Sequence, residues 1–212
     1  STLFPYTTLF RSPYSAALRD LPENDRREFG MRGVSYVNQL YGPDQELRML
    51  QRRDARFVNT AMMVTLGGAA VSDGLADGRV VSGVGGQYNF VSMAHALPGG
   101  RSLLCVRATR TKDGRTASNL VWSYGHVTIP RHLRDIVITE YGIADVRGRT
   151  DSETIAALLN VADSRFQPQL LEQAKAAGKI ARDYRIPDAF TGNLPQRLEE
   201  GLALYGDRKS VV

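Results

Sequence analysis

GVGGQYNF, residues 83–90, and TEYGIADVRG, residues 139–148, are the two most informative segments of this 212-residue chain. The first follows an apolar run and precedes a helix-like run at 91–97, so it predicts a strand, a glycine turn and a helix. Such a turn directs free backbone N–H groups at an anion or oxyanion. The second continues a buried-type strand that begins at Asp135, and it places Glu140 at the strand's end, where α/β folds keep their functional groups. Together the two segments indicate acyl chemistry.

The order of segments along the chain alternates strands with helices, which predicts an α/β fold: an open mixed or parallel sheet with flanking helices. Strands are expected at 34–37, 57–65, 69–72, 80–82, 103–108, 119–122 and 135–140. Helices are expected at 14–21, 23–29, 45–53, 91–97, 151–162, 166–177 and 194–204. The 45–53 helix should turn Leu47 and Leu50 to one face and its arginines to the other. Thr150 and Glu153 form a capping-box pattern, and 112–115 is a hairpin signal.

Composition excludes several classes of function. The net charge is +5, but the basic residues are scattered, which argues against nucleic-acid binding. No apolar stretch approaches membrane-spanning length. A single cysteine, Cys105, excludes a disulfide within the chain and fits a reducing, cytoplasmic setting. His95, His126 and His132 lack metal-ligand spacing, so we expect no metal and structural roles for all three.

Both ends of the chain match translated sequencing-adapter DNA. Residues 2–12 read TLFPYTTLFRS, which a common short-read adapter encodes, and 207–212 match the same adapter in reverse orientation. The alternative for the first segment is an apolar N-terminal arm. Segments of this kind are excluded from fold reasoning. We therefore expect artefactual flanks at 1–12 and 207–212 around one partial domain at 13–206, cut from a longer gene.

The two motifs resemble those of the acetyl-CoA hydrolase/transferase family, the class I CoA-transferases. GVGGQYNF is similar to that family's GxGGxxDF turn, with Asn89 where many members have aspartate, and TEYGIADVRGR is similar to TEYGxADLRGK. FVNTA at 57–61, GHVTIPR at 125–131 and ADSRF at 162–166 fit the same family. The resemblance covers about 13–206 and implies a truncated, CoA-transferase-like C-terminal domain.

The resemblance also implies a mechanism and partners. In this family a glutamate attacks an acyl-CoA thioester, which gives an acyl-glutamyl anhydride and then a glutamyl-CoA thioester that a carboxylate or water resolves. Coenzyme A or acyl-CoA would be a substrate, with no bound cofactor, and the full-length protein would be a homodimer. The attacking glutamate lies upstream of the FVNTA-like strand in the family, so we expect it to be missing here and the chain alone to be inactive.

Site residues carried over by resemblance come from both motifs. Gly86 would donate its N–H to the oxyanion, and Glu140 would support the reaction beside the nucleophile. Substrate-binding positions would be Gln45, Asn59, Gly85, Gln87 and Tyr88.

Each assignment has a structural alternative. The glycines could only make a tight turn, and Glu140 could pair with Arg147 or Arg149. Gln45 could be an exposed helix start, and Asn59 could satisfy a buried strand. Asp145 and Arg147 could form a local salt bridge with no catalytic role.

Two other classes of function remain open from the sequence. A dinucleotide-binding enzyme could use the glycine turn, although GVGGQY lacks the GxGxxG register and no acidic residue ends a following strand. A non-catalytic module of the same fold could bind CoA or a partner protein.

Overall fold

A computed structural model describes residues 16–28 and 33–203, which divide into one unit up to Val37 and a second from Asn38 onward. The flanks predicted at 1–12 and 207–212 lie outside the described residues. In the first unit, α2 (Glu23–Glu28) confirms a predicted helix, and α3 (Val34–Asn38) replaces the strand predicted at 34–37. Val34 is 73% exposed and pairs with no described strand. The preference of valine for strands depends on packing against a neighbouring strand, which is missing at this position in the described chain.

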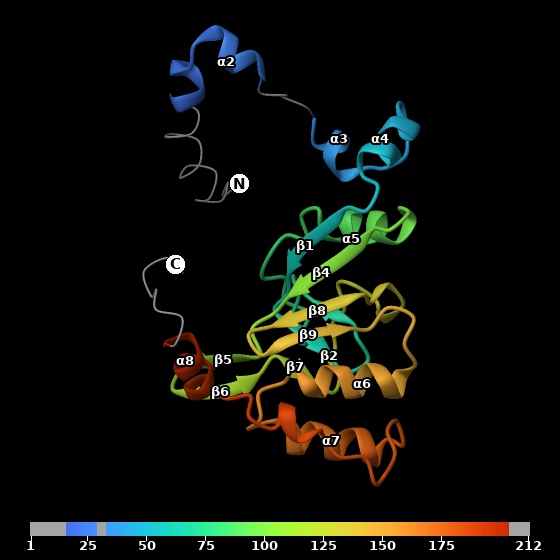
Figure 1. The fold of residues 1–212 in the computed structure, drawn as a ribbon, viewed down its shortest axis with the longest axis vertical. Coiled ribbons are helices and arrows are strands. Elements are labelled where there is room, and N and C mark those ends of the chain that lie inside the picture. The colour runs from blue at the N-terminus through green and yellow to red at the C-terminus, as the bar shows by residue number, and fades with distance from the viewer. Residues whose placement is uncertain (1–15, 29–32, 204–212) are drawn as a thin grey trace. The chain divides into compact units, whose positions relative to one another are not determined.

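The second unit is built on a four-stranded sheet in the order β1-β4-β8-β9 (Figure 1). Strands β1 (Arg56–Thr60), β4 (Arg101–Cys105) and β8 (Ile136–Thr139) are parallel, and β9 (Gly142–Asp145) runs antiparallel at the edge. The register places Thr60 beside Cys105 and Cys105 beside Ile138, so the three parallel strands end in line. This arrangement confirms the predicted α/β class with a mixed sheet.

Helix α5 (Gln87–Ala96) connects the parallel pair β1 and β4 and packs on both. The strand predicted before its glycine turn is absent from this part of the chain: Val80 makes only one bridge, to Gly74, and is 72% exposed. Val81 N–H donates to the Asp73 carbonyl oxygen at 2.8 Å, which holds the segment as a loop. The glycine turn is therefore entered from a loop.

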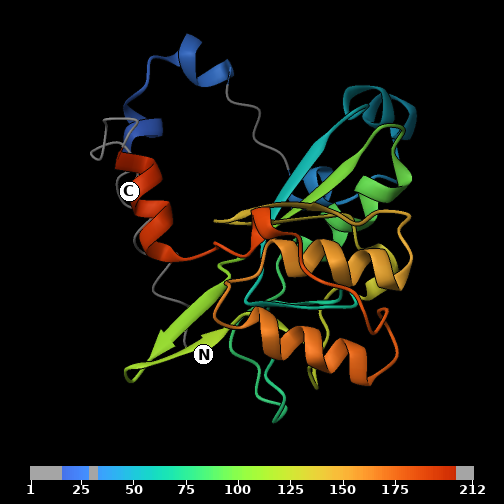
Figure 2. The same ribbon diagram turned by 60° about the horizontal axis from the view of Figure 1, so that its bottom comes forward.

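A smaller sheet has the order β3-β2-β7, formed by β2 (Met63–Thr65), β3 (Ala70–Val71) and β7 (Leu120–Val121). The predicted hairpin is confirmed as β5 (Thr109–Lys112) and β6 (Arg115–Ser118), and it projects away from both sheets in Figure 2. Asp113 and Gly114 at its tip both have positive φ, as a tight hairpin turn requires.

Helix α6 (Asp151–Asn160) lies against β9, and α7 (Gln167–Ala176) lies beyond α6 (Figures 1 and 2). The capping box that starts α6 is confirmed, because Thr150 and Glu153 each bond the other's backbone N–H. Short helices η1 (Arg131–Leu133) and η2 (Asp188–Phe190) and helix α8 (Pro195–Ala203) complete the unit. The main core lies between these layers and includes Val64, Leu66, Leu120, Leu158 and Leu159.

Helix α4 (Gln45–Gln51) confirms the predicted helix but not its predicted orientation. Leu47 and Leu50 are 52% and 71% exposed, whereas Arg48 is buried and donates to the Gln39 carbonyl oxygen at 3.2 Å. Met49 packs against a small cluster of Leu40, Met93 and Leu97. That contact decides which face of α4 turns inward.

Candidate active site

A cleft of about 610 Å³ lies at the carboxyl ends of β1, β4 and β8. Its lining comes from the ends of these strands and from the loops that follow them: Thr60, Ala61, Met62, Cys105, Val106, Arg107, Arg110, Asn119, Ile138, Thr139 and Glu140. Open α/β sheets bind their ligands at this edge. The cleft therefore lies where the fold places chemistry.

Glu140 follows β8 directly and lines this cleft. The Ala108 N–H donates to Glu140 Oε2 at 2.8 Å, which fixes the carboxylate against the neighbouring strand end. Thr139 is buried, and its hydroxyl donates to the Val161 carbonyl oxygen at 2.7 Å and accepts from Tyr141 N–H at 3.1 Å. The turn that carries Glu140 is thus anchored to the end of α6.

Neither arginine that could have paired with Glu140 does so. Arg147 bonds Asp135 at 2.6 Å, and Arg149 lies 3.7 Å from Glu153. Within the described ranges Glu140 forms no ion pair, so its charge faces the cleft without a counter-ion.

A buried ion pair lies behind the Glu140 turn. Asp163 is fully buried and binds Arg165 through both oxygens, at 2.8 and 2.7 Å, while the Tyr141 hydroxyl donates to it at 3.0 Å. Burial alone would raise the pKa of Asp163, but the hydrogen bonds from Arg165 and Tyr141 outweigh burial and lower it. Burial and the neighbouring Asp163 carboxylate raise the pKa of Tyr141, so this hydroxyl stays protonated and remains a donor.

The glycine turn approaches the same edge of the sheet. Gly85 has φ +59°, a left-handed conformation that favours glycine, and Gly86 is the N-cap of α5. The buried Gln87 side chain donates to the Thr60 carbonyl oxygen at 3.2 Å, which ties the start of α5 to the end of β1. Gly86 itself does not line the cleft, and among the described residues its N–H has no hydrogen-bond acceptor.

Of the remaining predicted site residues, Asn59 lies next to the cleft, and Tyr88 and Gln45 lie away from it. Asn59 immediately precedes the cleft residue Thr60, and its buried Nδ2 has no hydrogen-bond partner in the described chain. Tyr88 lines a separate hollow of about 190 Å³ beside Met93. Gln45 is the first residue of α4, and its amide lies 3.9 Å from Met49 Sδ. Helix α4 itself lies near the amino end of β1 in Figure 1. Neither Tyr88 nor Gln45 lines the cleft.

Sequence reasoning missed two cations in the cleft, Arg107 and Arg110. Arg110 is fixed by hydrogen bonds to Asn119 Oδ1 at 2.7 Å and to the Ser118 carbonyl oxygen at 3.0 Å. Asn119 in turn donates to the Arg107 carbonyl oxygen at 2.9 Å. The predicted strand extended through Ala108, but β4 ends at Cys105, which leaves Arg107 in the loop at the mouth of the cleft. A predicted strand that ended at Cys105 would have placed Arg107 in the loop after it, among the candidate site residues.

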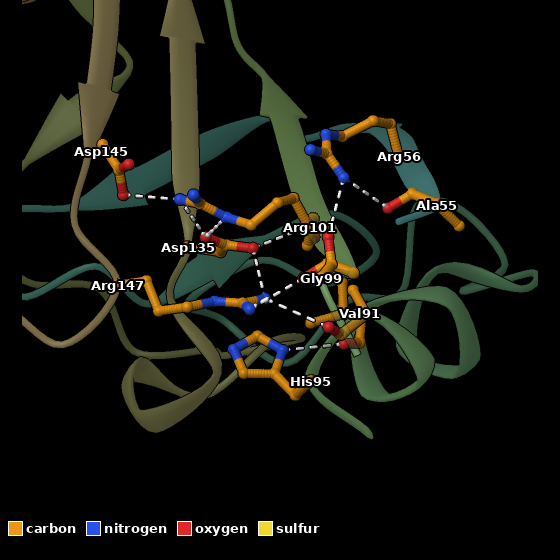
Figure 3. Close-up of polar contacts among 12 residues, drawn as sticks. Ala55, Arg56, Val91, His95, Gly99, Arg101, Asp135, Asp145 and Arg147 are labelled. Carbon is orange, nitrogen blue, oxygen red and sulfur yellow. Dashed lines mark hydrogen bonds and ion pairs between the residues drawn. The ribbon is translucent and has the colours of Figure 1, made fainter. Parts of the chain in front are cut away.

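A charged network occupies the opposite end of the sheet (Figure 3). The Asp135 side chain is 1% exposed and accepts from Arg101 at 2.8 Å, Ser102 N–H at 2.6 Å and Arg147 at 2.6 Å. Asp145 pairs with Arg101 at 2.7 Å, so the predicted local pairing of Asp145 with Arg147 is wrong. The hydrogen bonds that Arg101 donates to Asp145 and Asp135 raise the pKa of its guanidinium. This network joins the amino ends of β4 and β8 and touches no cleft residue.

The described residues contain no group of three or more His, Cys, Asp or Glu side chains that could hold a metal ion. Over the same residues, no helix has the length and apolar character needed to cross a membrane. The dinucleotide alternative loses its structural basis, because a loop rather than a strand precedes the glycine turn.

Residues 15–174 match the sequence model of the acetyl-CoA hydrolase/transferase C-terminal domain. The chain is 30% identical over 144 residues to 4-hydroxybutyrate coenzyme A transferase of Clostridium kluyveri, covering 67% of this chain and 32% of that protein. It is 31% identical over 160 residues to butyryl-CoA:acetate CoA-transferase of Anaerostipes caccae, covering 73% and 34%. The crystal structure of RipA from Yersinia pestis aligns with a TM-score of 0.58 at 28% identity, covering 69% of this chain and 32% of that one. The chain thus spans about a third of the length of the relatives it matches.

Proposed function

This chain belongs to the acetyl-CoA hydrolase/transferase family, and from that membership we propose that it forms part of an enzyme that transfers CoA between acyl-CoA and a carboxylate. A glutamate carboxylate attacks the thioester carbonyl, and the tetrahedral intermediate expels CoA thiolate to leave an acyl-glutamyl anhydride. The thiolate then attacks the glutamyl carbonyl, which releases the acyl carboxylate and leaves a glutamyl-CoA thioester. An acceptor carboxylate resolves that thioester by the reverse steps. In a hydrolase, water takes the acceptor's place.

Gly86 is the proposed oxyanion donor. Its N–H has no acceptor among the described residues, and the left-handed Gly85 beside it sets the direction of the turn at the start of α5. A preorganised backbone donor of this kind lowers the barrier by about 3 kcal/mol, because it needs no reorganisation when the negative charge develops.

Glu140 is proposed as the supporting carboxylate, held by Ala108 N–H and facing the cleft without a cationic partner. The single observation that supports the proposal most is this fixed carboxylate at the same sheet edge as the free glycine N–H. Asn59, Gly85 and Gln87 do not line the cleft, but Asn59 precedes its residue Thr60 and Gln87 bonds the Thr60 carbonyl oxygen, so this β1 and α5 side is proposed to face the substrate. Gln45 and Tyr88 stay outside the proposal because they lie away from the cleft.

The nucleophilic glutamate is proposed to come from polypeptide outside this chain, because Glu140 is the one carboxylate among the described residues that line the cleft. The 212-residue chain alone should therefore not transfer CoA. As in the sequence-based expectation, the complete enzyme is proposed to be a cytoplasmic homodimer that binds acyl-CoA and a carboxylate as substrates.

The test begins with the source DNA upstream of the codon for Pro13. The extended polypeptide and the 212-residue chain are each assayed for CoA transfer from acetyl-CoA to a carboxylate, and for release of free CoA. We expect activity only from the extended polypeptide, and a fall of at least about 100-fold in kcat for Glu140→Ala. Turnover by the short chain that Glu140→Ala abolishes would contradict the proposal. An extended polypeptide that binds CoA without turnover would instead be a non-catalytic binding module.

A further inference from the structure

The cleft contains more positive than negative charge. Its lining has one carboxylate, Glu140, and two guanidinium groups, Arg107 and Arg110, and none of the three forms an ion pair with another described residue. By contrast, Arg101, Arg147 and Arg165 each bind a buried aspartate. These three arginines therefore have a structural role, because each one neutralises a buried aspartate. The two arginines in the cleft have no such role.

The two cleft arginines are held differently. Arg110 is fixed to Asn119 Oδ1 and the Ser118 carbonyl oxygen, both neutral groups that leave its charge uncompensated. The Arg107 backbone is fixed through Asn119, while its side chain is exposed and makes no hydrogen bond in the part of the chain that the structure describes. Arg107 therefore retains a free planar fork, which matches the two oxygens of a carboxylate.

The free guanidinium belongs to the residue next to Ala108, whose N–H binds Glu140. Between the strand ends, the lining of the cleft also includes the apolar side chains of Met62, Val106 and Ile138. A short hydrocarbon chain would lie on this apolar surface with one end near Glu140. Any charge at its other end would remain within the same small cleft as the two arginines.

We propose that Arg107, with Arg110 beside it, binds a second carboxylate at the far end of the acyl or acceptor group, so that the site prefers dicarboxylic over monocarboxylic substrates. This inference rests on the proposed function for the identity of the reacting end. A phosphate of CoA is the other anion that could reach an arginine. It is separated from the thioester by the long pantetheine arm, whereas Arg107 adjoins the residue that holds Glu140.

The experiment uses the ¹⁵N-labelled 212-residue chain and NMR signals of its backbone and arginine side chains. Succinate and butyrate are titrated separately, because they have equal carbon chains and differ in the second carboxylate. Arg107→Gln removes the guanidinium, Arg107→Lys keeps the charge without the fork, and Arg115→Gln on the exposed hairpin is the matched control. CoA is the second probe, and unchanged spectra away from the cleft show that each variant folds.

We expect saturable succinate binding at the Ala108 and Arg107 signals, about 10- to 100-fold tighter than butyrate binding. Arg107→Gln should abolish the difference, Arg107→Lys should reduce it, and Arg115→Gln should preserve it, with CoA binding unchanged throughout. Equal binding of succinate and butyrate would overturn the inference, as would weaker CoA binding in Arg107→Gln, which would assign the guanidinium to a phosphate. Preferential succinate binding by this chain, together with an extended polypeptide that neither binds CoA nor transfers it, would support the dicarboxylate subsite while contradicting the proposed function.

Discussion

Asp163 illustrates how one buried charge can hold the Glu140 turn in place. It is fully buried and accepts from the Arg165 side chain twice, from the Arg165 backbone N–H and from the hydroxyl of Tyr141, the residue after Glu140. We predict that Asp163→Asn lowers the free energy of unfolding by about 1–3 kcal/mol, because the amide has no charge and places an NH2 donor where one of the two accepting oxygens was. Urea denaturation at neutral pH measures this loss. Asp188→Asn, at an exposed position, is the control and should leave stability unchanged.

The same residue predicts a difference in acid sensitivity. The pKa of Asp163 in the fold lies below its usual value of 3.8, so its stabilising effect is present above that value and is lost as pH falls through the lower, folded value. The stability difference between the native chain and Asp163→Asn should therefore be constant from pH 7 to about pH 5 and shrink below about pH 4. Thermal melts across this range test the prediction, and a difference independent of pH down to pH 2 would contradict it.

At the scale of single elements, the glycine turn before α5 allows a matched comparison. Gly85 has φ +59° and open space where a Cβ would lie, whereas Gly83 has the same open space without a left-handed φ. We expect Gly85→Ala to reduce stability by about 1 kcal/mol through backbone strain alone, and Gly83→Ala to have no measurable effect. Urea denaturation of both variants measures the difference. Equal effects would show that the conformation at Gly85 is not needed for the turn.

How far sequence predicts these elements depends on whether their signals are local. The capping box at Thr150 and the hairpin at Asp113-Gly114 are local and were predicted correctly. The predictions of strands at 34–37 and 80–82 are wrong, because a strand forms only beside the edge of a neighbouring strand, which no local pattern reveals. The inward face of α4 was wrong because contacts of Met49 with residues far along the chain decide it.

The candidate site shows the same division. Glu140 could be located from the sequence because a buried-type strand ends directly before it. Arg107 could not, because the predicted strand ran three residues too far and included it. Tyr88 belongs to the glycine-turn motif, but its position on α5 turns its side chain to another hollow. Gln45 begins α4, which precedes the amino end of β1 in the chain, whereas the cleft lies at the carboxyl end of β1. Sequence patterns indicate which segments approach a site better than which side chains enter it.

At the scale of the folded unit from Asn38 onward, the ion pairs that stabilise the central sheet and the candidate site lie at opposite ends of that sheet. Its amino end holds the Asp135 network, in which Asp135, Arg101, Asp145 and Arg147 are all ion-paired (Figure 3). Its carboxyl end holds the cleft, whose charged side chains form no ion pair with any described residue. The residues proposed to bind a ligand keep their charges unpaired, whereas the charged residues that join the strands bind each other. Changes at the two ends should therefore have separable effects.

We test this separation with two carboxylate-to-amide substitutions of equal size. Asp135→Asn removes the buried charge that both arginines bind: Arg147 loses its carboxylate partner and Arg101 keeps only Asp145. We therefore expect a loss of about 3 kcal/mol, or a fall in Tm of about 6–12 °C. Glu140→Gln keeps an acceptor for Ala108 N–H in an exposed position, so its Tm should change by less than about 2 °C. Below both melting points, the extended polypeptide should lose CoA transfer with Glu140→Gln but keep its activity per folded molecule with Asp135→Asn. Equal falls in Tm, or equal losses of activity, would show that the two ends of the sheet are energetically coupled.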